Sequence, residues 1–158
     1  MGQSTHYPII LASLIKNAQI KTVLELGLGA GESAEAMLKA LPKNGHMWSM
    51  DIAKCKAVSI KLASEYNGKW DFLAEVDDIN ARWKETVDMV YIDTSHTYEQ
   101  TLKELEKFAP YASRFIVLHD TASNPPVREA IVEFLTDDKK WAWAEWSHEF
   151  GLAMLMRI

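Results

Sequence analysis

Two stretches of this sequence place residues that could do chemistry at the end of an apolar run. Residues 90–98 read Val-Tyr-Ile-Asp-Thr-Ser-His-Thr-Tyr, and residues 117–121 read Val-Leu-His-Asp-Thr. Carboxylates can hold a divalent cation, and an imidazole titrates near working pH and can accept a proton from a substrate. The candidate reactive residues are therefore Asp93, His96, His119 and Asp120.

A third stretch, residues 23–33, combines a strand-like run, a glycine-rich turn and a helix start, and it reads Val-Leu-Glu-Leu-Gly-Leu-Gly-Ala-Gly-Glu-Ser. Glycine can adopt positive φ and lets a ligand approach the backbone, and a helix start offers free N–H groups. A dinucleotide-binding turn has the spacing G-x-G-x-x-G, whereas this turn reads G-x-G-x-G from Gly27 and has Glu32 where the third glycine would stand. The turn predicts a cofactor site and disfavours an NAD-linked oxidoreductase. A purely structural glycine-rich turn is the alternative.

The rest of the sequence alternates apolar runs with amphipathic segments, which predicts a parallel sheet covered by helices on both faces. The expected strands are residues 22–26, 46–51, 70–76, 87–93 and 114–119. The expected helices lie at residues 8–17 and near residues 34–41, 55–66, 98–109 and 127–135. Residues 78–84 leave room for a turn or two of helix at most.

Two further strand-like runs, residues 141–148 and 152–158, are joined by a short link, which predicts a hairpin. The expected fold is therefore α/β, a doubly wound, mostly parallel seven-stranded sheet with a C-terminal antiparallel hairpin. Residues 1–158 are expected to form a single domain. In such a sheet, ligands bind at the carboxyl ends of the strands, near the point where the strand order reverses.

Composition limits the partners that this sequence predicts. The 17 basic and 22 acidic residues give a net charge of -5, which argues against nucleic acid because phosphate binding needs a cationic surface. No apolar stretch approaches the ~20 residues of a membrane span. The single cysteine, Cys55, cannot form an internal disulfide, which favours a reducing compartment. We therefore expect a cytoplasmic protein without a membrane partner, whose Trp-rich hairpin packs internally or forms a homo-oligomer face.

The run E-L-G-L-G-A-G at residues 25–31 resembles motif I of class I S-adenosylmethionine-dependent methyltransferases. The resemblance implies a Rossmann-like methyltransferase fold with S-adenosyl-L-methionine as the cofactor. The cofactor contacts expected around the turn are Glu25, Gly27, Gly29, Gly31 and Ser33. The resemblance also implies that Asp51 accepts hydrogen bonds from the ribose hydroxyls, with Ile52 beside it, although Asp51 also suits a helix N-cap. An acid near the adenine amino group is expected at Asp77 or Asp78, for which a solvated turn is the alternative.

Residues 90–99 resemble the I-D-x-x-H-x-Y segment of metal-dependent O-methyltransferases, a group that includes macrolide-sugar methyltransferases and relatives of catechol O-methyltransferase. Residues 117–121 resemble the strand end of that group that carries two polar ligands. If these strands are neighbours about 4.8 Å apart, Asp93 and Asp120 lie together beside the cofactor and repel unless a cation sits between them. The expected ligands of a divalent metal, Mg or Mn, are Asp93, His119 and Asp120. His119 stands where sugar methyltransferases usually have Glu, and imidazole suits Mn, Fe or Zn better than Mg.

These features predict methyl transfer from S-adenosylmethionine to a hydroxyl of a small molecule or sugar, with His96 and Asp93 as the catalytic residues. A metal-free enzyme, in which His96 is steadied by Asp93 or Asp120, is one alternative. Purely structural roles are another: a helix cap for Asp93, a loop histidine for His96 and a core histidine for His119. A cofactor-binding module that needs a partner subunit is the alternative for the whole chain. The acceptor walls are expected in residues 3–7 and 121–126.

Overall fold

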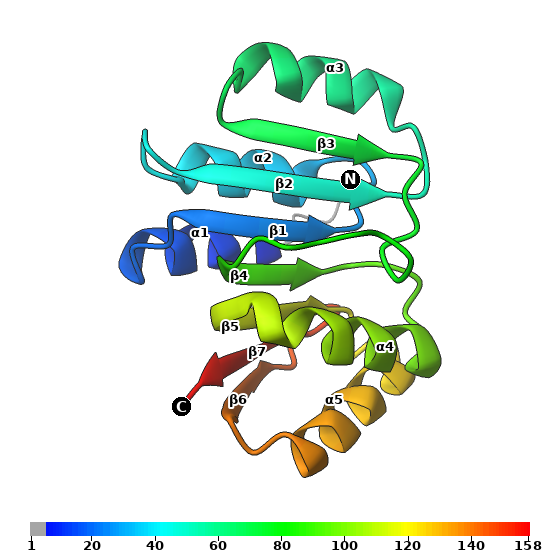
Figure 1. Cartoon of the computed structure of the whole chain (residues 1–158). Helices are drawn as coiled ribbons and strands as arrows, with labels where there is room; N and C mark the ends of the chain where they lie inside the picture. Colours follow the sequence, from blue (N-terminus) through cyan, green and yellow to red (C-terminus); the bar gives the residue numbers. More distant parts are fainter. Residues whose placement is uncertain (1–5) are drawn as a thin grey trace.

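The computed structural model describes residues 6–158 and contains a seven-stranded sheet flanked by helices (Figure 1). The strand order is β3-β2-β1-β4-β5-β7-β6. Strands β1 to β5 pair in parallel, and β7 runs antiparallel to both β5 and β6. The predicted sheet and its terminal hairpin are therefore confirmed. The strands are β1 (Thr22–Leu26), β2 (His46–Asp51), β3 (Trp70–Ala74), β4 (Val87–Ile92), β5 (Ala112–His119), β6 (Trp141–Trp146) and β7 (Leu152–Arg157).

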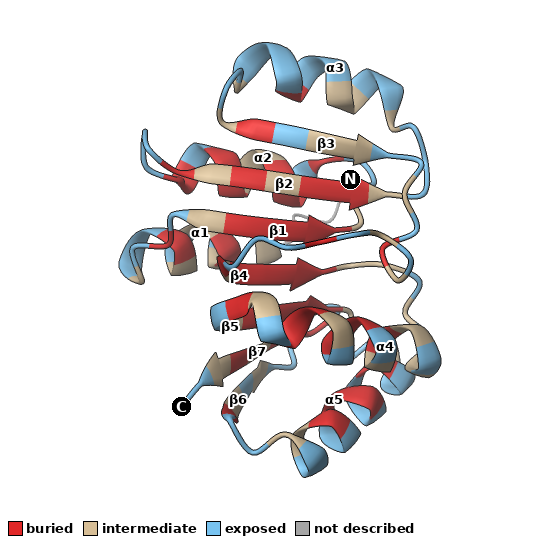
Figure 2. Ribbon diagram, viewed as in Figure 1, coloured by how far each residue is buried: buried red, intermediate tan, exposed pale blue. Residues whose placement is uncertain are grey.

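The helices form two layers that bury alternate residues of the central strands (Figure 2). Val23 of β1 packs in a core with the first three helices, whereas its neighbour Leu24 packs in a second core with the last two. This double burial explains why the central strands are continuous apolar runs. The helices are α1 (Tyr7–Asn17), α2 (Glu32–Ala40), α3 (Lys56–Glu65), α4 (Tyr98–Phe108) and α5 (Pro125–Asp137), with the short 3₁₀ helix η1 (Ala109–Tyr111) after α4.

Local sequence explains where the helices nearest the strand ends begin. The side chain of Thr97 accepts a hydrogen bond from the Gln100 N–H and caps α4. Pro125 starts α5, because proline tolerates the first helical turn, where N–H groups have no partner. These two helices follow β4 and β5 directly, so both begin at the carboxyl edge of the sheet.

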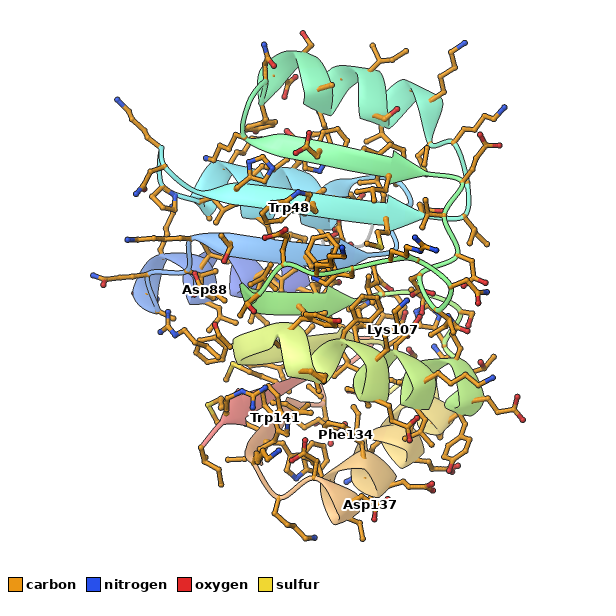
Figure 3. All side chains as sticks on the ribbon, in the orientation of Figure 1. Trp48, Asp88, Lys107, Phe134, Asp137 and Trp141 are labelled. Atoms are coloured by element: carbon orange, nitrogen blue, oxygen red, sulfur yellow. The ribbon has the colours of Figure 1, made fainter. Side chains whose placement is uncertain are left out.

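The connection from β3 to β4 contains no helix, which corrects the expected turn or two of helix in residues 78–84. The Asp77 carboxylate accepts a hydrogen bond from the Ile79 N–H, and such a side-chain contact favours a turn over helix. Trp83 packs edge-on against Trp48 of β2 with ring centroids 5.5 Å apart. Trp83 thereby covers a part of the sheet near Trp48, which is labelled in Figure 3.

Among the described residues, no helix is both long enough and apolar enough to cross a bilayer.

Candidate active site

A cavity of about 480 Å³ lies at the carboxyl ends of β1, β2 and β4. The helix that follows β1 lies in one helix layer, and the helix that follows β4 lies in the other. In an open α/β sheet, the binding crevice is expected between two such strands. The cavity mixes apolar walls with a few convergent polar groups, which is typical of a small-molecule site. Predicted cofactor residues that line it are Gly27, Gly29, Asp51, Ile52, Asp77, Asp78 and Asp93.

The glycine-rich turn after β1 packs closely against the end of β4. At Gly27, φ is +91° and an added Cβ would lie 2.0 Å from the carbonyl oxygen of Asp93. At Gly31, φ is +80° and a Cβ would meet the Val58 side chain of α3 at 2.3 Å. Gly29 has open space and lines the cavity. Gly31 therefore serves the packing of α3, and the cofactor contact expected for it stays a prediction.

The carboxylate of Asp51 accepts hydrogen bonds that fix the conformation of the glycine-rich turn. Its Oδ2 atom accepts hydrogen bonds from the Leu28 and Gly29 N–H groups at 2.9 and 3.0 Å, and Oδ1 accepts one from the Ala53 N–H. Burial works against its charge, but these backbone hydrogen bonds outweigh burial and lower the pKa of Asp51. Asp51 is therefore an ionised acceptor at the cavity wall that also shapes the turn.

Glu25 lies behind the turn and is fully buried. Its carboxyl oxygens accept hydrogen bonds from the hydroxyls of Ser33 and Ser49, each at 2.6 Å. Burial raises the pKa of Glu25 to about 8 despite these hydrogen bonds. Neither Glu25 nor Ser33 lines the cavity; both support the turn, and their expected contact with the cofactor stays a prediction.

The turn after β3 carries two acids in different surroundings. Asp77 is exposed at the cavity rim, whereas Asp78 is buried and accepts hydrogen bonds from the Ile79 N–H and the Gln100 side chain. Lys107 of α4 donates to the carbonyl oxygens of Asp78, Ile79 and Ala81. The solvated-turn alternative is therefore wrong for Asp78.

The four predicted reactive residues meet at the adjacent ends of β4 and β5. Nε2 of His96 lies 3.0 Å from Oδ1 of Asp93 and 2.8 Å from Oδ2 of Asp120. Nδ1 of His119 lies 3.5 and 3.2 Å from the same two oxygens. Two carboxylates therefore face two imidazoles, and Asp93 also lines the cofactor cavity.

The backbone at this cluster is unusual. His96 has φ +55° and Asp120 has φ +62°, both in the left-handed region that few residues other than glycine adopt. Such conformations persist where the surroundings enforce them, and they are common at functional sites. Here they bring the two side chains into contact, with His96 Nε2 and Asp120 Oδ2 2.8 Å apart.

The charges of the cluster stabilise one another. Burial disfavours an ionised Asp93, but its contacts with the His119 and His96 rings hold its pKa well below the usual range. The hydrogen bond to Asp93 raises the pKa of His96, with a further contribution from the charge of Asp120. The pKa of His119 is also raised, because the attraction of Asp93 and Asp120 outweighs the burial that would lower it. The carboxylate pair therefore attracts positive charge.

The residues at this site fit a divalent cation. Ligand atoms of Asp93, His119 and Asp120 lie within 4.8 Å of one another. Nδ1 of His119 is buried and makes no well-formed hydrogen bond within the described part of the chain, so a cation there would satisfy it. One imidazole and two carboxylates suit Mn, Fe or Zn better than Mg. In place of a metal, an Nε2–H group of His96 can donate to both carboxylates.

Several residues at the site were not predicted. Thr94, Ser95 and Gln100 line the cavity, and the Tyr7 ring packs against His119 with centroids 4.3 Å apart. Phe150, in the link between β6 and β7, lies on another side of His119. Tyr7 falls at the end of the predicted acceptor wall in residues 3–7, whose first three residues lie outside the described residues. The contacts of Tyr7 and Phe150 with His119 join segments that are distant in the sequence, so short-range sequence patterns do not reveal them.

Comparison with known proteins identifies the family. A family model described as a methyltransferase domain matches residues 24–121. This match covers more than half of the chain, and the chain therefore belongs to this methyltransferase domain family. The predicted recognition is confirmed. No curated protein matches the chain.

Solved structures share the fold at low sequence identity. The O-methyltransferase TomG from Streptomyces achromogenes, crystallised with SAM, has a TM-score of 0.76 and 14% identity over 99% of this chain and 81% of its own. The O-methyltransferase from Bacillus cereus, in complex with SAH, has a TM-score of 0.75 and 17% identity over 99% and 83%. A protein from Clostridium thermocellum, provisionally described as an rRNA methylase, has a TM-score of 0.74 and 16% identity over the whole of both chains.

Proposed function

We propose that the chain transfers a methyl group from S-adenosylmethionine to a hydroxyl group of a small molecule or sugar. One observation carries the proposal: Asp93 lines the cofactor cavity and also contacts His96 and His119. The cofactor site and the candidate acceptor site therefore meet at one residue. The Streptomyces and Bacillus O-methyltransferases, which were crystallised with SAM and SAH, support this choice of cofactor.

The residues of the cavity have separate tasks in this proposal. Ionised Asp51 accepts hydrogen bonds from the ribose hydroxyls, and the turn with Asp77 and Asp78 contacts the base. His96 faces the acceptor hydroxyl as the general base. A carbon–oxygen bond forms at the acceptor while the bond between the methyl carbon and the cofactor sulfur breaks, and the hydroxyl proton passes to His96. Alignment of the reacting atoms supplies much of the rate.

A divalent metal is a second element of the proposal. Asp93, His119 and Asp120 would hold it, and a bound metal would lower the pKa of the acceptor hydroxyl. In a metal-free enzyme, Asp93 and Asp120 orient His96 instead, as their contacts with its Nε2 atom allow.

A small acceptor fits this chain better than RNA does. The net charge is -5, whereas binding of an RNA backbone calls for a cationic surface. Acidic side chains also surround the cavity, at Asp51, Asp77 and Asp93. We therefore do not extend to this chain the acceptor in the description of the Clostridium protein.

Two measurements test the proposal. Calorimetric titration with S-adenosylhomocysteine and with NAD should show binding of the first ligand alone. Turnover of a panel of phenols, sugars and other alcohols with labelled S-adenosylmethionine should then give methyl ethers. If S-adenosylhomocysteine binds and no acceptor is methylated, the alternative of a binding module that requires a partner replaces the enzyme. If S-adenosylhomocysteine does not bind, the proposal is wrong.

A further inference from the structure

Helix α4 presents a polar stripe to the cofactor cavity. Gln100, Glu104 and Lys107 follow one another at helical spacing and therefore lie on one face. All three contact the turn formed by residues 77–81, which forms part of the cavity wall. Glu104 is fully buried, which is rare for an acid without a cationic partner. Lys107 is labelled in Figure 3.

The hydrogen bonds of Glu104 leave one of its oxygens facing another acid. Oε1 accepts hydrogen bonds from Thr94 Oγ1 at 2.7 Å and from Gln100 Nε2 at 2.9 Å. Gln100 Nε2 also donates to Oδ1 of Asp78 at 2.9 Å. Oε2 of Glu104 and Oδ2 of Asp78 are both buried, and no donor from the described residues reaches either atom. Gln100 Nε2 thus bridges the two acids, and their two free carboxyl oxygens are close enough for one acid to donate a hydrogen bond to the other.

Such a pair must share a proton. Two carboxylates in contact repel strongly unless a cation neutralises one of them. Lys107 is the cation of this stripe, but its ammonium group donates to three backbone carbonyls and makes no ion pair with either acid. Burial, with the contact to Asp78 added, raises the pKa of Glu104 to about 9. At neutral pH, Glu104 is therefore uncharged, and its proton lies between the two groups.

We propose that Glu104 is a positioning residue of the cofactor site, which as a neutral carboxyl group donates a hydrogen bond to Asp78 and so fixes the turn that contacts the base of the cofactor. The proposal rests on the proposed function, because it takes the ligand of this cavity to be S-adenosylmethionine. Loss of the proton would place two negative charges in contact and displace Asp78 from the cavity wall. Cofactor affinity should therefore fall at alkaline pH.

Among the other groups that face this pair, Lys107 is the one whose effect must be separated from that of Glu104. Thr94 and Gln100 carry no charge. Asp77, on the same turn, is an exposed acid, and Lys107 is bound to carbonyl oxygens. Burial lowers the pKa of Lys107, and the nearby charges of Asp78 and Asp77 oppose this shift. Because Lys107 titrates in the alkaline range, a variant of Glu104 itself must isolate the contribution of the carboxyl pair.

The experiment measures the Kd of S-adenosylhomocysteine by calorimetry between about pH 7 and pH 10 for four forms of the chain. These are wild type, Glu104→Gln, Asp78→Asn and the control Glu106→Gln, which changes an exposed acid of the same helix. The α-amino group of the ligand titrates in this range, but it does so identically for every variant. The ratio of Kd values between two variants at one pH therefore reports the protein alone.

The wild-type Kd, divided by that of Glu104→Gln, should rise by about tenfold for each pH unit above about 9. At neutral pH the two values should agree within about threefold, because the amide of glutamine also donates a hydrogen bond to Asp78. Glu106→Gln should follow wild type at every pH. If Glu104→Gln does not fold, Asp78→Asn gives a second test: no acid then faces Glu104, so the fall in affinity between about pH 7 and pH 10 should be smaller than in wild type.

A ratio that stays constant with pH for a folded variant would overturn the role of Glu104 and leave the proposed function intact, since wild type would still bind the ligand. Absence of binding by wild type at neutral pH would overturn both.

Discussion

Nε2 of His96 lies 2.8 Å from Oδ2 of Asp120, although the two residues follow different strands and are separated by the whole of α4. The contact exists because β4 and β5 are parallel neighbours whose carboxyl ends meet. It places an imidazole beside both carboxylates of the cluster and next to the cofactor cavity.

This position predicts that His96→Ala slows methyl transfer without weakening cofactor binding. Loss of a general base reduces kcat by about 10²–10⁴. His96 does not line the cavity, so the Kd of S-adenosylhomocysteine should remain close to the wild-type value. Steady-state kinetics and calorimetry measure the two effects. His148→Ala, which changes an exposed histidine of the β6–β7 link, is the control. Wild-type kcat in His96→Ala would assign the base to another group.

Metal dependence can be tested on the same cluster. If Asp93, His119 and Asp120 hold a cation, exhaustive chelation should abolish turnover, and added Mn should restore it at least as well as Mg. His119→Ala removes a proposed direct ligand and should weaken the metal affinity by more than the roughly 10- to 100-fold that is typical for loss of an outer-shell partner. Turnover that persists after chelation would show that His96 works without a metal.

Asp51 is expected to affect cofactor binding in two ways. Asp51→Ala removes the charged acceptor for the ribose and the hydrogen bonds to the glycine-rich turn. The loss should be about 1.5–3 kcal/mol of binding free energy, measured by calorimetry. Asp51→Asn keeps one acceptor oxygen and should lie between Asp51→Ala and wild type. Asp71→Ala, which changes an exposed acid of β3, should bind normally. Equal affinity in Asp51→Ala and wild type would remove Asp51 from the site.

Two glycines of the same turn should respond differently to alanine. Gly27→Ala places a Cβ against the Asp93 carbonyl group, and the ends of β1 and β4 must then separate. Gly29→Ala has open space and meets only the strain of φ +50°, about 1 kcal/mol. Thermal melts of the ligand-free chain should therefore show the larger loss for Gly27→Ala. The reverse order would contradict the close contact with Asp93.

The buried Glu25 makes stability depend on pH. Its pKa is about 8 in the folded chain and 4.5 at its ordinary value, so its contribution to stability is complete below 4.5 and is lost as the pH rises through 8. Glu25→Gln stays neutral, so its melting temperature should rise relative to wild type between pH 5 and pH 9. Each kcal/mol corresponds to about 2–4 °C in a domain of this size. Glu65→Gln, at an exposed position, should follow wild type, and a constant difference between Glu25→Gln and wild type would contradict the burial of an ionisable group.

The sequence patterns that predicted the fold and the site best were those of strands that lie side by side in the sheet. Apolar runs that end in Asp93 and Asp120 predicted both the parallel sheet and the meeting of the two acids, because strand order brings those ends together. Contacts that depend on the path of a loop were not predictable. The approach of Gly27 to the Asp93 carbonyl group and the packing of Tyr7 on His119 are of this kind.

The role of α4 shows a second limit. Gln100, Glu104 and Lys107 form a polar stripe, and polar residues at this spacing usually indicate a solvated helix face. In the structure the stripe faces the coil between β3 and β4, because this connection has no helix of its own and its carbonyls and acids need partners. To recognise that this stripe is buried, one would have had to predict that no helix forms between β3 and β4.

The left-handed backbone at His96 and Asp120 has a consequence for protein engineering. Glycine adopts this conformation without steric strain, so replacement of Asp120 by glycine would relieve local strain of about 1–2 kcal/mol. The same change would remove the contacts of Asp120 with His96 and His119 and would increase the conformational entropy of the unfolded chain. Asparagine tolerates the left-handed conformation and keeps the size of the side chain, so asparagine is the replacement that separates the charge of Asp120 from its backbone conformation.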